Sequence, residues 1–208
     1  ALVSNETLNN NDRKERTMKK ALTAGFASLL LTGVLSAPAS ALTVGDVDVP
    51  DTYSAMGQEL KLNGAGTRSK WFMDLYVGGL YVPEQVSDGE AVINADEPQA
   101  ITLHITSGMI TSERMTEATM DGFKASTDGD LSAIQSDVDQ FMAVFQEEIT
   151  EGDVFDLVYL PGEGVRVLKN GEQKDTVGGL EFKKALFGIW LSDKPAQEDL
   201  KEKMLGQR

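Results

Sequence analysis

The feature that most constrains the fold is a repeated change of hydrophobic period along the chain. Short runs within residues 42–106 and 154–177 alternate apolar and polar residues, as strands do. Residues 111–149 and 181–205 instead place apolar residues at helical spacing. The order is strands, a helix pair, strands, a helix pair, with turn residues between strands. This order predicts an α+β fold, with one antiparallel sheet and helices packed on one face.

Glycine-containing segments mark the expected turns. Asn170-Gly171 is typical of a tight hairpin. Residues 63–66 predict a turn that interrupts the chain before Arg68, and Gly78-Gly79 predicts a bend within residues 71–82, or a division into two strands. Residues 101–105 alternate, so we expect a strand with one side facing the core.

Helix boundaries can be expected at four places. Thr111 or Ser112 is suited to cap a helix that ends near residues 126–130, and Asp130 to begin a second that extends to residue 149. Two more helices are expected over residues 181–191 and 196–205. All four should lie on the sheet.

The N-terminal segment resembles a leader for export. Residues 18–20 are basic, residues 21–35 form an uncharged apolar run, and Ala39-Ser40-Ala41 fits a cleavage site. The run is short for a membrane span. We therefore predict an extension at residues 1–17, expected to be disordered, a signal peptide at residues 18–41 and one domain at residues 42–208, with no integral membrane segment in the mature chain.

Composition removes several classes of chemistry. The chain has no cysteine and a single histidine, His104, so disulfides and thiolate metal sites are excluded, and we expect no metal site and no cofactor. Asp128-Gly129-Asp130 lacks the remaining carboxylates of a calcium loop and is interpreted as a helix cap. A Ser/His/Asp hydrolase has no supporting motif.

Charge removes nucleic acid as a partner. The formal charge is −14, and the first 41 residues carry five Lys/Arg and three Asp/Glu, which leaves −16 on the rest. Phosphate backbones and anionic lipid headgroups repel such a chain. The late basic residues, Lys183 and Lys184 with Lys201 and Lys203, are spread among acidic ones.

Arg68 is the one candidate for binding chemistry that the residues themselves indicate. It begins a strongly apolar stretch, where a guanidinium packs poorly, and its planar fork can hold a carboxylate or enolate oxygen. The alternative is an edge-strand arginine paired with a surface acid.

Several ordered segments together are similar to one family. They are residues 62–68, 77–82, 112–114, 152–153, 170–171 and 182–191. From about residue 47 to 206 the chain resembles the chalcone isomerase-like family, especially its exported bacterial branch. The resemblance implies an open-faced sandwich with a cleft between sheet and helices, and a periplasmic location.

The resemblance also implies site residues. In the plant enzymes an arginine stabilises the oxyanion formed as a chalcone is cyclised, whereas in fatty-acid-binding relatives the arginine and a tyrosine hold a carboxylate. Arg68 matches the arginine. Thr111 stands at the tyrosine position, Ala118 at an asparagine, Ile189 at a late-helix Ser/Thr and Tyr76 near the cleft threonine. These five are the predicted ligand-binding residues, and Arg68 is the catalytic candidate if the chain is active.

The departures from the family pattern favour binding over catalysis. We expect an exported, non-catalytic protein that binds a small apolar carboxylate such as a fatty acid, with Tyr76 or Tyr81 supplying a hydroxyl. Four methionines are suited to line the cleft or to fill the core: Met109, Met115, Met120 and Met142. The alternatives are an envelope interaction domain with a filled cleft, and a weak isomerase acting on an unsaturated carbonyl compound.

Overall fold

The structure is a computed structural model that describes residues 40–55 and 57–207. The predicted extension and nearly all of the predicted signal peptide lie outside the described residues, so both stay predictions. The first described strand begins at Ala41, the last residue of that predicted leader. Among the described residues, no helix has both the length and the apolar character needed to cross a bilayer.

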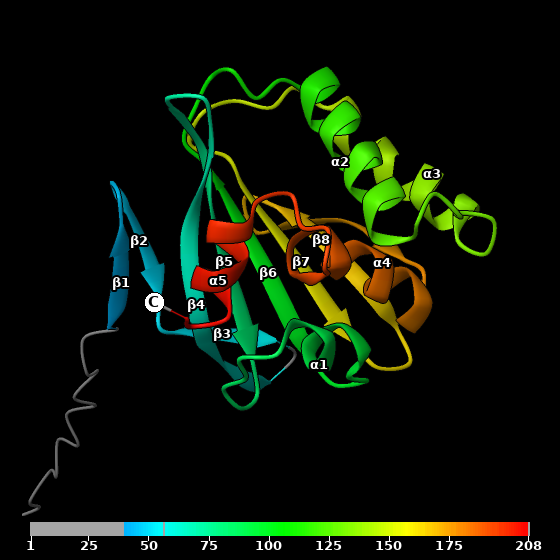
Figure 1. The fold of residues 1–208 in the computed structure, drawn as a ribbon, viewed down its shortest axis with the longest axis horizontal. Helices are drawn as coiled ribbons and strands as arrows, with labels where there is room; N and C mark the ends of the chain where they lie inside the picture. The colour runs from blue at the N-terminus through cyan, green and yellow to red at the C-terminus, as the bar shows by residue number, and fades with distance from the viewer. Residues whose placement is uncertain (1–39, 56, 208) are drawn as a thin grey trace, which may run out of the picture. The chain divides into compact units, whose positions relative to one another are not determined.

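Seven strands form one antiparallel sheet in which each strand pairs with the next along the chain (Figure 1). Their bounds are β3 Thr52–Ala55, β4 Gln58–Lys70, β5 Met73–Val82, β6 Gln99–Ile105, β7 Val154–Leu160, β8 Gly164–Lys169 and β9 Glu172–Val177. A separate hairpin consists of β1 Ala41–Val44 and β2 Val47–Pro50. Gly45-Asp46 forms the turn of this hairpin, and the predicted hairpin turn at Asn170-Gly171 is confirmed.

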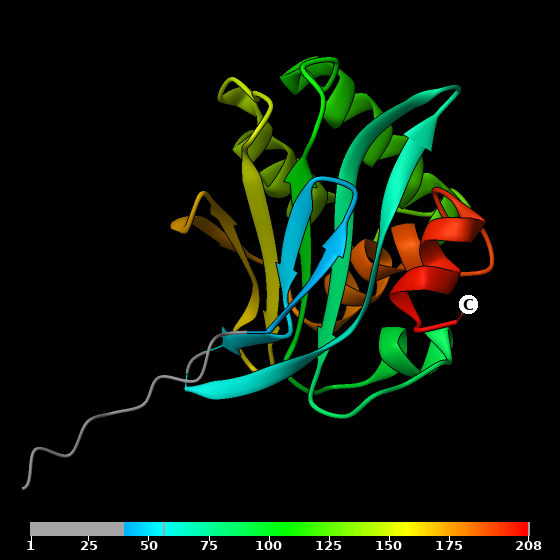
Figure 2. The same cartoon turned by 90° about the vertical axis from the view of Figure 1, so that its left-hand side faces the viewer.

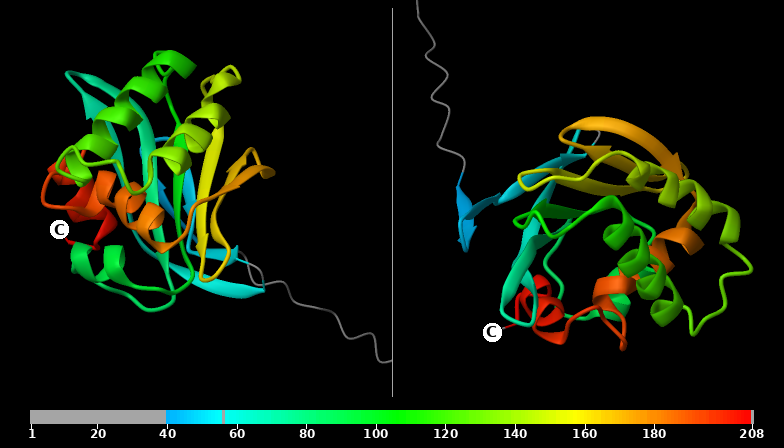
Figure 3. Two further views of the ribbon diagram at one scale, coloured as in Figure 1. Left: turned by 90° about the vertical axis from the view of Figure 1, so that its right-hand side faces the viewer. Right: turned by 90° about the horizontal axis from the view of Figure 1, so that it is seen from above.

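The helices pack on one face of the sheet, which confirms the predicted α+β class (Figures 1 and 3). Their bounds are α1 Gly89–Asn94, α2 Ser112–Ser126, α3 Gln135–Ala143, α4 Leu180–Leu191 and α5 Glu198–Met204. The second predicted helix is shorter than expected at both ends. It begins at Gln135, with Ile134 in place of the predicted Asp130 as its N-cap, and after α3 the chain tightens into the 3-10 turn η1, Val144–Gln146. The short helix α1 was not predicted.

Apolar side chains are buried on both faces of the sheet. The larger cluster lies under the helices, whereas a smaller one includes Val49 of the β1–β2 hairpin, which lies over the opposite face (Figure 2). Strand β6 contributes to both, with Ile101 in the first cluster and Ala100 in the second. The predicted core side of residues 101–105 is confirmed by Ile101, Leu103 and Ile105, but the expectation of a single covered side is wrong, because Thr102 on the other side is buried as well.

The predicted turn at residues 63–66 is also wrong, because β4 runs through it from Gln58 to Lys70. A Cβ on Gly64 would lie 2.0 Å from the backbone oxygen of Lys203, and one on Gly66 would lie 2.8 Å from the Lys203 Cβ. These glycines therefore let α5 pack directly on the strand, and they do not turn the chain. The long strand β5 likewise continues through Gly78-Gly79.

The turn between β4 and β5 consists of Trp71 and Phe72, since Lys70 pairs with Met73. Trp71 has a φ of 60°, in a region that bulky residues avoid. Such a backbone conformation costs about 1–3 kcal/mol. The sequence interpretation had placed both residues in a strand.

Candidate functional site

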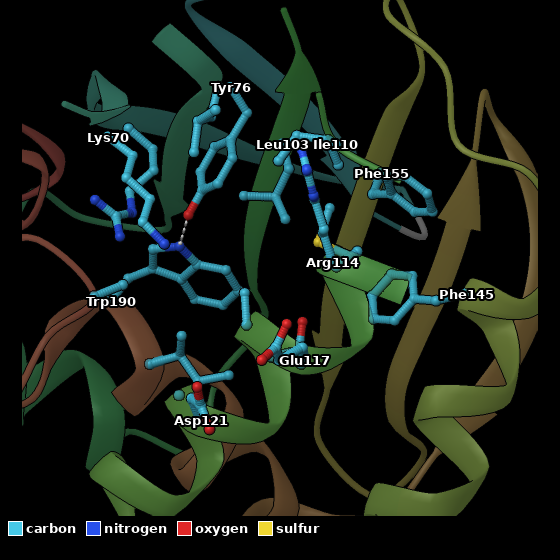
Figure 4. Close-up of a pocket in the computed structure, with 18 of the residues that line it drawn as sticks. Lys70, Tyr76, Leu103, Ile110, Arg114, Glu117, Asp121, Phe145, Phe155 and Trp190 are labelled. Carbon is cyan, nitrogen blue, oxygen red and sulfur yellow. Dashed lines mark hydrogen bonds between the residues drawn. The ribbon is translucent and has the colours of Figure 1, made fainter. Parts of the chain in front are cut away.

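A cavity of about 580 Å³ lies between the sheet and the helical layer (Figure 4). Its sheet wall comes from β5, β6 and β7, with Leu103, Phe155 and Leu157 among the lining residues. Helices α2 and α4 close the opposite side. The predicted cleft is therefore open, and its volume is in the range of small-molecule sites, roughly 300–1,000 Å³.

Arg68 lies on β4 at the rim of this cavity, half-buried and directly opposite Tyr76 of β5. Its Nη1 donates to the Ser69 carbonyl oxygen at 2.8 Å and to Gln197 Oε1 at 2.9 Å. Among the described residues, no carboxylate forms an ion pair with Arg68, and no acceptor takes a hydrogen from its Nη2 or Nε. The protein therefore uses the Nη1 donors of the guanidinium, and Nη2 and Nε, which together can hold a bidentate carboxylate, have no acceptor among the described residues.

Tyr76 presents a second donor to the cavity. Its hydroxyl oxygen accepts a hydrogen bond from Trp190 Nε1 at 2.9 Å, drawn as the dashed line in Figure 4. Burial raises the pKa of Tyr76 above its ordinary value, an effect that the Trp190 hydrogen bond and the charge of Arg68 oppose. No described residue accepts the hydroxyl hydrogen. The phenol is therefore neutral, with its proton available to a guest.

The cavity lining carries more positive than negative side chains, although the chain as a whole is acidic. In a chain of net −14, the charged lining residues are four cations and two acids. They are Arg68, Lys70, Arg114 and Lys194, with Glu117 and Asp121. Lys194 is paired with Asp128, whereas Arg68, Lys70 and Arg114 form no ion pair with a described carboxylate. Of these three cations, Arg68 is the one that lies directly opposite Tyr76.

The comparisons with known proteins identify the family. A family model described as chalcone isomerase-like matches residues 41–206. The chain belongs to the chalcone isomerase-like family. Among solved structures, it is similar to a fatty-acid binding protein of Arabidopsis thaliana, with a TM-score of 0.62 and 17% sequence identity over 77% of this chain and 92% of that one. At that identity the likeness shows the fold. Among curated proteins, none matches the chain.

Four of the five residues carried over from the chalcone isomerase-like family line the cavity: Arg68, Tyr76, Ala118 and Ile189. The fifth, Thr111, does not. Its hydroxyl accepts a hydrogen bond from the Arg114 backbone N–H at 3.3 Å, as the N-cap of α2. The capping role that the sequence indicated for Thr111 is the one that the structure shows.

Of the other residues that were expected to line the cavity, Tyr81 and the four methionines, some do and some do not. Tyr81 lies in the cluster on the far face of the sheet and donates to the Pro50 carbonyl oxygen at 2.9 Å, so of these two tyrosines Tyr76 is the one that brings its hydroxyl to the cavity. Met109 and Met115 line the cavity, whereas Met120 and Met142 pack against the core.

Sequence reasoning missed the two side chains that orient the polar pair. Gln197 holds Arg68 from a position 129 residues away, and Trp190 holds Tyr76 from 114 residues away. Trp190 falls within the helix predicted over residues 181–191, but nothing in the sequence linked it to Tyr76 or linked Gln197 to Arg68. Among the described residues, no group of three or more metal-ligating side chains gathers.

Proposed function

We propose that the protein is exported and binds a small apolar carboxylate, such as a fatty acid, in this cavity without transforming it. The observation that carries the proposal is the polar pair at the cavity wall. Arg68 has free guanidinium donors, Tyr76 has a free hydroxyl proton, and both face a space with apolar walls. A carboxylate would accept from both residues, and its alkyl chain would lie against Leu103, Phe155 and Leu157.

The similar structure supports this class of ligand, since that protein is itself a fatty-acid binding protein. The cavity has the two parts that such a ligand requires, a cationic rim and an apolar interior. The excess of cations among its charged lining residues also favours an anionic guest over a cationic one.

Catalysis has less support from the same geometry. The family's asparagine and late-helix Ser/Thr positions are occupied by Ala118 and Ile189, which can neither orient a polar substrate nor move a proton. Tyr76 is kept neutral by burial, so it is a donor and a poor base. The open cavity also speaks against the alternative of an interaction domain with a filled cleft.

Calorimetric titration with hexadecanoic acid and with its methyl ester tests the proposal. Wild-type protein should bind the acid more tightly than the ester, because only the acid offers a charge to Arg68. Arg68→Gln should weaken binding of the acid by about 10- to 100-fold, since hydrogen bonds to charged groups contribute about 1.5–3 kcal/mol. The affinity of Arg68→Gln for the ester should fall much less.

Arg166→Gln is the matched control, because Arg166 lies on β8, outside the cavity lining, and pairs with Glu163. It should leave both affinities unchanged. Equal affinity of wild type and Arg68→Gln for the acid would remove Arg68 from the account, and equal loss of acid and ester would point to a damaged cavity.

The export part of the proposal has its own test. N-terminal sequencing of protein recovered from the periplasm of a bacterial host should give Leu42 as the first residue. Recovery of the intact chain from the cytoplasm alone would contradict it.

A further inference from the structure

Large apolar side chains are exposed mainly at one end of the domain. Among the described residues, five large hydrophobic side chains are exposed, and four of them lie on the β4–β5 turn and in the connection from β6 to α2. They are Trp71, Phe72, Met73 and Met109. Trp71 is 81% exposed and Phe72 is fully exposed. We call Lys70–Met73 together with Met109 the aromatic tip; its two segments lie at the same end of the sheet (Figures 1 and 2).

The turn itself argues that these aromatic residues are not there for folding. The other described non-glycine residues with positive φ are Asp128 and Asn170, whose types tolerate that conformation. Trp71 is the exception, at a hairpin position where glycine or asparagine would be less strained. A strained backbone that holds an exposed aromatic pair indicates a role for that pair outside the folded core.

The aromatic tip is also the rim of the cavity. Trp71, Met73 and Met109 line it, together with the cations Lys70 and Arg114. Lys70 lies over the Trp71 ring, 5.9 Å from its centre. The acidic lining residues Glu117 and Asp121 come one and two turns further along α2, away from the end that joins β6.

We infer that the aromatic tip docks on a phospholipid surface, so that the cavity opens toward the acyl chains. Tryptophan and phenylalanine partition into the interface of a bilayer, while flanking Lys and Arg contact the phosphate groups. The inference of docking rests only on the residues of the aromatic tip. Only the identity of the cargo, an acyl carboxylate taken from or delivered to that surface, rests on the proposed function.

Charge favours a lipid surface over a second copy of the chain. Two copies each carry a formal charge of −14 and repel one another. The same net charge opposes a strongly anionic membrane, but screening limits its reach to about 8 Å at physiological ionic strength. Close to the surface, the residues at the tip therefore count most. Lys70 and Arg114 are complementary to lipid phosphate and offset the exposed acids Asp74 and Glu113 beside them.

Tryptophan fluorescence of the full chain reports on the tip directly. The chain has two tryptophans, and Trp190 is only 5% exposed but lines the cavity. Emission is therefore recorded in a Trp190→Phe background, in which Trp71 is the remaining tryptophan. The probe is vesicles of phosphatidylcholine with a minor share of phosphatidylglycerol, made with and without brominated acyl chains. Emission should shift to shorter wavelength on binding, and the brominated chains should quench it.

Phe72→Ser should weaken vesicle binding at least 10-fold, and Lys70→Glu several-fold. Leu42→Ser is the matched control, since Leu42 is the remaining exposed large hydrophobic residue and lies on β1; it should have no effect. Because the N-terminal apolar run is the same in all variants, differences between them report on the substituted positions.

Three results would overturn the inference. They are unquenched Trp71 emission on vesicles, equal effects of Leu42→Ser and Phe72→Ser, and a spectral shift that follows protein concentration without lipid, which would indicate self-association. Arg68→Gln separates the two proposals, since it should dock normally while failing to hold hexadecanoic acid. Failure of docking in wild type alongside normal acid binding would leave the proposed function intact.

Discussion

Lys183 and Arg68 are both withdrawn from bulk water, yet their surroundings differ in one decisive way. Lys183, on α4, is fully buried, and its Nζ donates to the carbonyl oxygens of Val92 at 2.6 Å, Ile93 at 3.0 Å and Ala95 at 2.9 Å. These are the last carbonyls of α1 and its C-cap, so all three ammonium hydrogens are used within the fold. Arg68 lines the cavity, uses only Nη1 and leaves its other donors without an acceptor among the described residues.

The comparison shows that unused hydrogen-bonding capacity, more than burial, distinguishes a binding cation from a structural one. The ammonium of Lys183 also lies 5.3 Å from the centre of the Tyr159 ring and 5.2 Å from the centre of the Phe187 ring. With three carbonyl groups and two aromatic rings around it, the ammonium has no contact with solvent. It stabilises the end of α1, where the carbonyl groups and the helix dipole favour a positive charge. Sequence analysis noted Lys183 only as one of four late basic residues spread among acidic ones, and it did not predict that Lys183 is buried.

The largest expected effect on stability comes from removing the ammonium of Lys183. Lys183→Met should lower the free energy of unfolding by about 3 kcal/mol, because three buried carbonyl groups lose their donor. Urea denaturation measures this. Lys184→Met removes an exposed lysine paired with Glu181 and should change stability by less than about 1 kcal/mol. Equal effects would mean that the α1 contacts of Lys183 contribute little.

The next effect is a dependence of stability on pH. Burial lowers the pKa of Lys183 from 10.5 to about 8. Between those values the unfolded chain binds more protons than the folded one, so stability should rise with pH, by about 3 kcal/mol in total. The difference in unfolding free energy between wild type and Lys183→Met, followed from pH 8 to 10.5, should show this rise; a flat difference would contradict it.

A smaller effect is expected at the open site from Tyr76→Phe. Loss of the hydroxyl should weaken the binding of hexadecanoic acid about 5-fold, near 1 kcal/mol, and should weaken the binding of the ester less. The substitution also leaves Trp190 Nε1 without its acceptor, so titrations should be made well below the unfolding temperature. An unchanged affinity would leave Arg68 as the only polar contact.

The smallest effect sharpens the comparison most. Arg68→Gln should change the free energy of unfolding by no more than about 0.5 kcal/mol, because a half-buried cation without an acidic partner contributes little to the fold. Thermal denaturation without ligand measures it. A loss as large as that of Lys183→Met would make Arg68 a structural cation as well.

Much of the fold was predictable because its elements carry local signals. Helix α2 begins at the predicted Thr111 cap, and the Asn170-Gly171 turn joins β8 to β9 as expected. Gly64 and Gly66 misled the interpretation, since a glycine required by a close helix looks the same in sequence as one required by a turn. Only the contact with α5, about 140 residues further along, distinguishes the two cases.

The site was predictable only in part. The residues themselves indicated Arg68, the resemblance supplied Tyr76, and the two do face one another across β4 and β5. Gln197 and Trp190 were not, because side chains that orient a site from distant segments leave no local pattern. The exposed pair Trp71-Phe72 looked like a buried strand, because hydrophobicity alone does not tell a core from an exposed tip.

The account rests on a carboxylate held by the free edge of Arg68, and the pKa of the bound acid tests this most directly. Hexadecanoic acid labelled with ¹³C at its carboxyl carbon can be titrated by NMR while bound to wild type and to Arg68→Gln. An apolar site raises the pKa of a carboxyl group, whereas a neighbouring guanidinium lowers it by roughly one to three units. We expect the bound acid to titrate at least about one unit lower in wild type than in Arg68→Gln. Identical titration curves in the two proteins would show that the carboxylate does not contact Arg68.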